Sequence, residues 1–123
     1  MAVVLLVDDD DTYRCILRRW LVSKGHEVIE ASNGRIGIEQ CHKSHPDVVV
    51  TDVFMPEADG LEMSMDVVAS HCAKGVIVLS GGGKTMTGGC FLEYAKGLGA
   101  NEAFQKPVDK ERFLAAVASI AES

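Results

Sequence analysis

Several features that would assign this sequence to a particular class of protein are missing from it. The chain has 123 residues and a formal net charge of −6, so it lacks the basic surplus that attracts nucleic acid or an anionic membrane surface. No apolar stretch approaches the roughly 20 residues that a membrane-spanning helix requires. No basic leader precedes the first apolar run, Val3–Val7, so no signal peptide is indicated. We therefore expect a cytoplasmic protein that binds neither nucleic acid nor membranes.

The cysteines also lack the spacing of a metal or redox motif. No two of them are separated by two residues, and we interpret them as reduced, mostly buried thiols: Cys15, Cys41, Cys72 and Cys90. The closest approach to a transition-metal motif is Cys41 with His42 and His45, beside Asp47. The favoured interpretation of that group is a polar helix end stopped by Pro46.

Apolar runs that are too short for helices predict the central strands of a sheet. These runs are rich in β-branched residues and carry apolar side chains on both faces, as in strands covered on two sides. They occupy Val3–Val7, Val48–Val53 and Val76–Leu79. We expect two further strands, at Glu27–Ala31 and Glu102–Gln105.

Segments with a helical spacing of apolar residues separate the predicted strands. The first runs through Tyr13–Leu21 and is followed by Gly25 as a stop, and the second covers Gly34–Ser44 and ends before Pro46. The other three are expected around Leu61–Val68, from near Cys90 to Gly97 or Gly99, and around Phe113–Ala121. This alternation predicts an α/β fold in which residues 1–123 form a single domain, a parallel sheet with helices on both faces.

Polar side chains stand where the predicted strands end. Asp8 and Asp9 follow the first strand, and Asp52 ends the third. Ser80 follows the fourth strand and Lys106 follows the fifth. Because the carboxyl ends of parallel strands meet at one edge, where open α/β folds bind ligands, we expect these five side chains to lie together. Clustered carboxylates repel one another unless they share a cation, and oxygen ligands suit Mg²⁺.

The same five groups suit phosphoryl transfer, which depends on positioning and charge neutralisation. Asp52 is the expected nucleophile, and Asp8 and Asp9 would hold the metal. Ser80 would donate a hydrogen bond to one phosphoryl oxygen, and Lys106 would neutralise another. Acids at strand ends are often only solvated loop residues, but five polar groups at the ends of four strands weigh against that interpretation.

The order of these residues resembles the receiver domain of two-component response regulators. The resemblance rests on Leu6–Asp10, Thr51–Pro56 with Asp59-Gly60, Ser80, Gly99-Ala100 and Lys106-Pro107. It extends over the whole chain, and the Asp-x-x-Met-Pro-x-x-Asp-Gly stretch combined with the late Lys-Pro is specific. The chain is therefore identified as a member of that family, of the stand-alone, single-domain type.

The resemblance implies a flavodoxin-like, doubly wound sheet of five strands in the order 2-1-3-4-5, with five helices. It implies signal transduction in which Asp52 takes a phosphoryl group from a phosphohistidine on a histidine kinase or histidine phosphotransfer protein, switching the binding of an unknown output protein. It implies that Asp9, Asp52 and the carbonyl of Phe54 bind Mg²⁺ and that Asp8 lies near the ion and contacts it through a water molecule. The Lys106-Pro107 bond is often cis in such domains. A protein of this kind is a regulator that catalyses its own phosphorylation and dephosphorylation, not an enzyme with a separate substrate.

Two positions depart from the family pattern. Receivers usually carry an aromatic residue three positions before the lysine, where this chain has Ala103, followed by Phe104. The usual aromatic switch is therefore in question. Ser80 is followed by a glycine-rich segment, and we hypothesise that signalling involves ordering of Gly81–Gly89.

A phosphatase of the haloacid dehalogenase type is the strongest alternative. Asp8-Asp9-Asp10-Asp11-Thr12 matches its Asp-x-Asp-x-Thr motif, with Asp8 as the nucleophile and Asp10 as the general acid. However, the chain is short for that fold, and the third strand ends in one acid where a pair is expected. Met55-Pro56 and Lys106-Pro107 also stay unexplained, so we favour the receiver interpretation.

Two further alternatives have less support. Gly83-Lys84-Thr85 resembles the end of a phosphate-binding P-loop, but the first glycine of that motif would fall at Val78, inside a predicted strand. A non-catalytic interaction module with vestigial acids would have no need of all five polar groups.

Overall fold

A computed structural model describes residues 2–52, 60–80, 97 and 99–123. Along the chain, the elements are β1 (Val3–Val7), α1 (Asp11–Ser23), β2 (Glu27–Ala31), α2 (Gly34–Ser44), β3 (Val48–Asp52), α3 (Gly60–Ser70), β4 (Gly75–Ser80), β5 (Glu102–Gln105) and α5 (Lys110–Ala121). The strands form one sheet in the order β2-β1-β3-β4-β5, and every neighbouring pair is parallel. The predicted fold class and strand order are confirmed.

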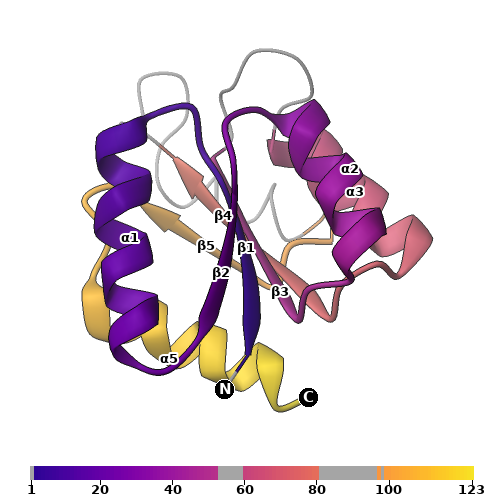
Figure 1. Ribbon diagram of the computed structural model, residues 1–123. Coiled ribbons are helices and arrows are strands. Elements are labelled where there is room, and N and C mark those ends of the chain that lie inside the picture. Colours follow the sequence, from indigo (N-terminus) through magenta and orange to yellow (C-terminus); the bar gives the residue numbers. More distant parts are fainter. Residues whose placement is uncertain (1, 53–59, 81–96, 98) are drawn as a thin grey trace.

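Helices cover both faces of the sheet. Helices α1 and α5 lie on one face, and α2 and α3 lie side by side on the other (Figure 1). Each face has its own apolar core. Leu17 and Phe113 are buried under α1 and α5, whereas Met63 and Val67 of α3 are buried on the opposite face. The apolar runs β3 and β4 are buried along their whole lengths, as their sequences predict.

Side-chain caps fix the places where three helices begin. The carboxylate of Asp10 accepts hydrogen bonds from the backbone N–H groups of Thr12 and Tyr13 at the start of α1. Asn33 and Asp109 cap α2 and α5 in the same way. Each cap satisfies a backbone donor that the first turn of a helix leaves unpaired. The loop after β1 is thereby held against α1, next to the carboxyl edge of the sheet.

Most of the predicted element boundaries agree with the structure. Gly25 has a φ of 85° just after α1, as expected of a glycine stop. Strand β4 is longer than predicted and includes Ser80 as its last residue. The fourth helix, predicted from near Cys90 to Gly97 or Gly99, lies outside the described residues except at its predicted end, where Gly97 is helical, and the Gly81–Gly89 segment lies outside them as well. Within the described part of the chain, no helix has both the length and the apolar character that crossing a membrane would take.

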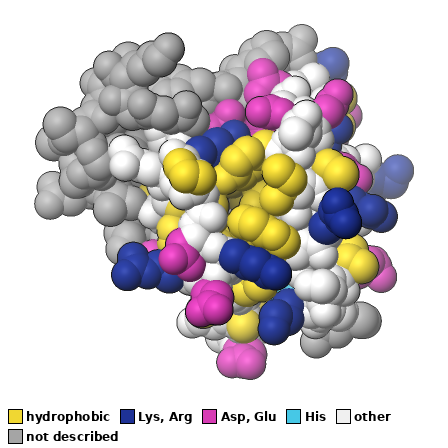
Figure 2. All heavy atoms as spheres, turned by 90° about the vertical axis from the view of Figure 1, so that its left-hand side faces the viewer, with side chains coloured by type: hydrophobic (Ala, Val, Ile, Leu, Met, Phe, Trp, Pro, Cys, Tyr) yellow, Lys and Arg dark blue, Asp and Glu magenta, His cyan; other side chains and the backbone are white. Residues whose placement is uncertain are grey.

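The side of the molecule formed by α1 carries a mixed surface. Figure 2 shows hydrophobic side chains gathered in the middle of this side, with charged side chains of both signs around them. Two of the hydrophobic residues of α1 are partly exposed, Ile16 at 38% and Val22 at 49%. Val22 points away from the core and Ile16 borders the face that contacts it, and both are exposed enough to be accessible to another protein.

Candidate phosphoacceptor site

Four of the five predicted polar groups stand at the carboxyl edge of the sheet and are largely withdrawn from solvent. Asp8 follows β1, Asp52 ends β3 and Ser80 ends β4, with exposures of 2%, 7% and 3%. Lys106 follows β5, and its backbone N–H donates to the carbonyl of Ser80 over 2.8 Å. Asp9 lies at the same edge but is exposed. The parallel sheet therefore brings together residues from four strand ends, as the sequence predicts.

Three carboxylates at this edge are arranged so that one cation can reach them all. Asp8, Asp9 and Asp52 each offer an oxygen, and the three oxygens lie within 4.8 Å of one another. Two of the carboxylates are buried and would repel each other in the charged form. Hard oxygen donors with one exposed member, which leaves room for water, fit Mg²⁺ better than a soft metal. The donor set is thus suited to the predicted ion.

Lys106 supplies positive charge within the same cluster. Its Nζ lies 2.9 Å from Asp8 Oδ2 and 3.9 Å from Asp52 Oδ2. Burial lowers the pKa of Lys106, but the hydrogen bond to Asp8 and the charges of Asp52 and Asp8 outweigh burial and raise the pKa above its ordinary value. The ammonium group also lies 4.3 Å from the centre of the Tyr13 ring. Lys106 is therefore charged at neutral pH and held in place.

Tyr13 links α1 to the segment after β5. Its hydroxyl oxygen accepts a hydrogen bond from the backbone N–H of Val108, with a distance of 2.9 Å. The intervening Lys106-Pro107 peptide bond is cis, as expected. Sequence reasoning placed Tyr13 only on the apolar face of the first helix. Its second role is invisible in the sequence because its partner stands 95 positions away.

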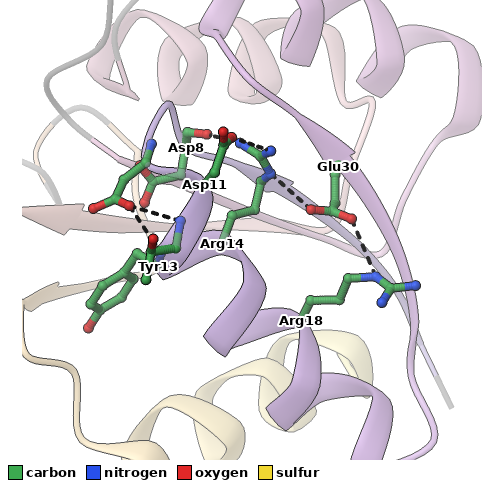
Figure 3. Close-up of polar contacts among 8 residues, drawn as sticks. Asp8, Asp11, Tyr13, Arg14, Arg18 and Glu30 are labelled. Carbon is green, nitrogen blue, oxygen red and sulfur yellow. Dashed lines mark hydrogen bonds and ion pairs between the residues drawn. The ribbon is translucent and has the colours of Figure 1, made fainter.

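Arg14 supports the loop that carries the acids, and the sequence analysis missed it (Figure 3). Its Nη1 donates to the carbonyl oxygen of Asp8 over 2.6 Å. Its Nη2 and Nε make ion pairs with Asp11 and Glu30, at 2.7 and 2.9 Å. The side chain is only 16% exposed. Arg14 thus ties the backbone at Asp8 to both α1 and β2, and no local pattern in the sequence indicates these contacts.

Ala103, at the usual aromatic position, and the next residue, Phe104, lie on opposite faces of the sheet. Ala103 is buried in the core under α2 and α3. Phe104 belongs to the opposite core, where its ring meets that of Phe113 edge-on at 6.4 Å. Neighbouring residues of a strand point to opposite faces, so Phe104 does not stand in for an aromatic residue at position 103. Phe54, whose carbonyl was predicted as a metal ligand, lies outside the described residues.

The phosphatase alternative gains no support from the site. That alternative requires Asp10 as a general acid, but the carboxylate of Asp10 caps α1.

Comparison with known proteins shows which family the sequence is similar to. The family model described as the response regulator receiver domain matches residues 4–118. Protein PilH of Pseudomonas aeruginosa is 31% identical over 122 residues, which cover 98% of both chains. The chemotaxis protein CheY of Bacillus subtilis is 30% identical over 115 residues, covering 93% of this chain and 92% of CheY.

Solved structures agree with the fold. The Francisella response regulator 1452 receiver domain superposes with a TM-score of 0.88 at 20% identity, covering 99% of this chain and 98% of that one. Chemotaxis protein CheY4 of Vibrio cholerae superposes with a TM-score of 0.81 at 29% identity, covering 98% of each chain. The likeness therefore extends over nearly the full length of single receiver domains.

Proposed function

This chain belongs to the response regulator receiver domain family, and from that premise we propose that Asp52 is the phosphoacceptor of a Mg²⁺-dependent phosphorelay. One observation supports the proposal above others. Asp52 ends β3 beside two further carboxylates and 3.9 Å from the ammonium of Lys106. A nucleophilic carboxylate next to a metal-binding acid pair and a fixed cation is what transfer of a highly charged phosphoryl group demands.

Each residue of the site has a defined task in this proposal. A carboxylate oxygen of Asp52 forms a bond to phosphorus while the phosphorus–nitrogen bond of a phosphohistidine breaks, and the imidazole keeps the bonding electrons and takes up a proton. Lys106 neutralises one phosphoryl oxygen, and the hydroxyl of Ser80 donates a hydrogen bond to another. Asp8, Asp9, Asp52 and the carbonyl of Phe54 would hold Mg²⁺. When bound, the ion supplies positive charge against the phosphoryl oxygens.

The partners follow from the chemistry of the donor and from the family. A histidine kinase or a histidine phosphotransfer protein supplies the phosphoryl group, and the partly exposed apolar residues of α1 offer a surface for its docking. Phosphorylation then changes the binding of a protein output partner. In this scheme the chain is a cytoplasmic regulator that catalyses its own phosphorylation and dephosphorylation, not an enzyme acting on a separate substrate.

Intact-mass spectrometry tests this proposal directly. The wild-type chain, incubated with acetyl phosphate and Mg²⁺, is expected to gain the mass of one phosphoryl group. Asp52→Asn removes the nucleophile and should abolish the gain, and a chelator should suppress it in the wild type. Glu111→Gln changes an exposed acid in the first turn of α5, so this control should be phosphorylated normally. A full gain in Asp52→Asn would overturn the assignment.

A further inference from the structure

A second group of potential metal ligands lies between α2 and α3, away from the acidic cluster. His42 belongs to the last turn of α2, Asp66 belongs to α3, and Cys72 follows the end of α3. Each offers one donor atom, and the three donor atoms lie within 4.8 Å of one another. We propose that His42, Asp66 and Cys72 form a binding site for a transition metal ion of the Zn²⁺ class.

The location makes this site independent of the phosphoacceptor. Helices α2 and α3 each follow a parallel strand and return the chain toward the opposite edge of the sheet, where both helices end (Figure 1). His42 lies in the last turn of α2 and Cys72 two residues beyond the end of α3. The His42 group is thus near the amino-terminal ends of the strands, whereas Asp8, Asp9 and Asp52 stand at the carboxyl-terminal ends.

The donor types select the kind of ion. The acidic cluster offers only oxygens, but this group offers an imidazole nitrogen, a sulfur and one carboxylate oxygen. Thiolate and imidazole ligands favour Zn²⁺ and its neighbours in the first transition row over Mg²⁺. The metal would take the place of the proton between His42 and Asp66, and the thiol proton of Cys72 would pass to solvent. No redox change is needed.

The distances require only a small adjustment. His42 Nε2 lies 2.8 Å from Asp66 Oδ2. Two ligands of a tetrahedral zinc ion at bond lengths of about 2.0 Å stand roughly 3.3 Å apart, so the pair must open by about half an ångström. The sulfur of Cys72 is at most 4.8 Å from each of the other donors. Nitrogen and sulfur ligands of one zinc ion stand about 3.6 Å apart, so the sulfur moves by roughly one ångström at most.

The partly exposed side chains of His42 and Asp66 let an ion reach the site from solvent and leave one coordination position open to water. The side chains of His42 and Asp66 are 46% and 33% exposed, while Cys72 is buried. The ion would therefore enter from the solvent side between the two helices and keep a water there as a further ligand. Beneath it, the buried thiol of Cys41 lies close to Cys72 and interacts with it.

Cobalt absorption is the first test, because Co²⁺ is a coloured probe for zinc sites. The chain is titrated with Co²⁺ under a thiol-free reductant and with excess Mg²⁺ to occupy the acidic cluster. We expect thiolate-to-cobalt absorption that saturates at one equivalent and disappears when Zn²⁺ is added. Cys72→Ser should lose this absorption, and His42→Ala should weaken the apparent affinity at least tenfold. Cys15→Ser, which removes an exposed thiol on α1, should behave like the wild type.

A folding check and one additional variant, Asp52→Asn, keep the result decisive. Because Cys72 is buried, its serine variant is first compared with the wild type by circular dichroism, and the surface variant His42→Ala gives an independent answer if Cys72→Ser does not fold. Asp52→Asn should bind Co²⁺ as the wild type does, since that residue lies at the other edge. An apparent Co²⁺ affinity of His42→Ala equal to that of the wild type, or an absence of any cobalt–thiolate band in the wild type, would overturn the proposal.

Discussion

Lys106 is paired most closely with Asp8, not with the proposed phosphoacceptor Asp52. Its Nζ donates to Asp8 Oδ2 over 2.9 Å, whereas Asp52 Oδ2 lies 3.9 Å away. The two partners stand 98 positions apart in sequence and join the end of β1 to the segment after β5. Their side chains are 3% and 14% exposed for Asp8 and Lys106. The pair therefore balances charge in a site that has three acids, two of them buried.

Replacing Lys106 by methionine should destabilise the protein. The substitution leaves the buried carboxylates without a cation, and we expect the free energy of unfolding to fall by about 1–3 kcal/mol in the absence of Mg²⁺. Added Mg²⁺ should reduce this deficit, because the ion offsets the same negative charge. Urea denaturation with and without Mg²⁺ measures both effects. Lys110→Met, at an exposed position of α5, is the control, and an equal loss in both variants would contradict the role given to Lys106.

Arg14 and Arg18 allow a matched comparison within one helix. Both contact Glu30, but Arg14 is 16% exposed and also holds the carbonyl of Asp8, while Arg18 is 52% exposed. Arg14→Gln should lower the free energy of unfolding by about 1–2 kcal/mol and slow the phosphorylation of Asp52, because the loop after β1 loses its anchor. Arg18→Gln should cost less than about 1 kcal/mol. Thermal denaturation and the mass assay report the two effects, and equal behaviour of both variants would exclude the anchoring role.

Gly99 should not tolerate a side chain. Its φ is 106°, and a Cβ at this position would lie 2.4 Å from Cγ2 of Val68. Backbone strain and this close contact together should cost about 2 kcal/mol or more in Gly99→Ala. Gly97 lies two residues earlier with no heavy atom within 4 Å of an added Cβ, so Gly97→Ala should leave stability within about 1 kcal/mol of the wild type. Denaturant titration of the two chains separates these outcomes, and a stable Gly99→Ala protein would refute the steric explanation.

His26 should make stability depend on pH. Its Nδ1 accepts a hydrogen bond from the backbone N–H of Ala2, and burial lowers its pKa below the ordinary value. As pH falls below about 6.5, the unfolded chain takes up a proton on this histidine before the folded chain does, so the free energy of unfolding decreases. The stabilisation that neutral His26 contributes to the folded state is fully present above that pH. His26→Asn retains an acceptor without the titration, and its stability should fall less steeply between pH 7 and 5 in denaturant titrations. Parallel curves for the two proteins would show that His26 does not cause the dependence.

Local sequence determined the elements and the edge at which the acids meet. Val3–Val7 and Gly34–Ser44 have the predicted bounds because β-branched runs and helical periodicity are properties of neighbouring residues. Alternation of strands and helices then forces a parallel sheet, and a parallel sheet places all strand ends at one edge. For this reason the sequence alone assigns Asp8, Asp52 and Lys106 to a common site.

The tertiary structure alone decided which partners those residues and their neighbours have. The sequence grouped His42 with the adjacent Cys41 and His45, whereas in the fold His42 meets Asp66 and, within 4.8 Å, the sulfur of Cys72. The rotation of α2 that produces these contacts is set by packing. A Cβ on Gly37 would lie 2.8 Å from Val7 Cγ2 and 3.1 Å from Met63 Sδ, so α2 approaches both the sheet and α3 closely at this point. The spacing of residues along one helix does not specify which face meets its neighbour, because that choice depends on the shapes of side chains contributed by distant parts of the chain.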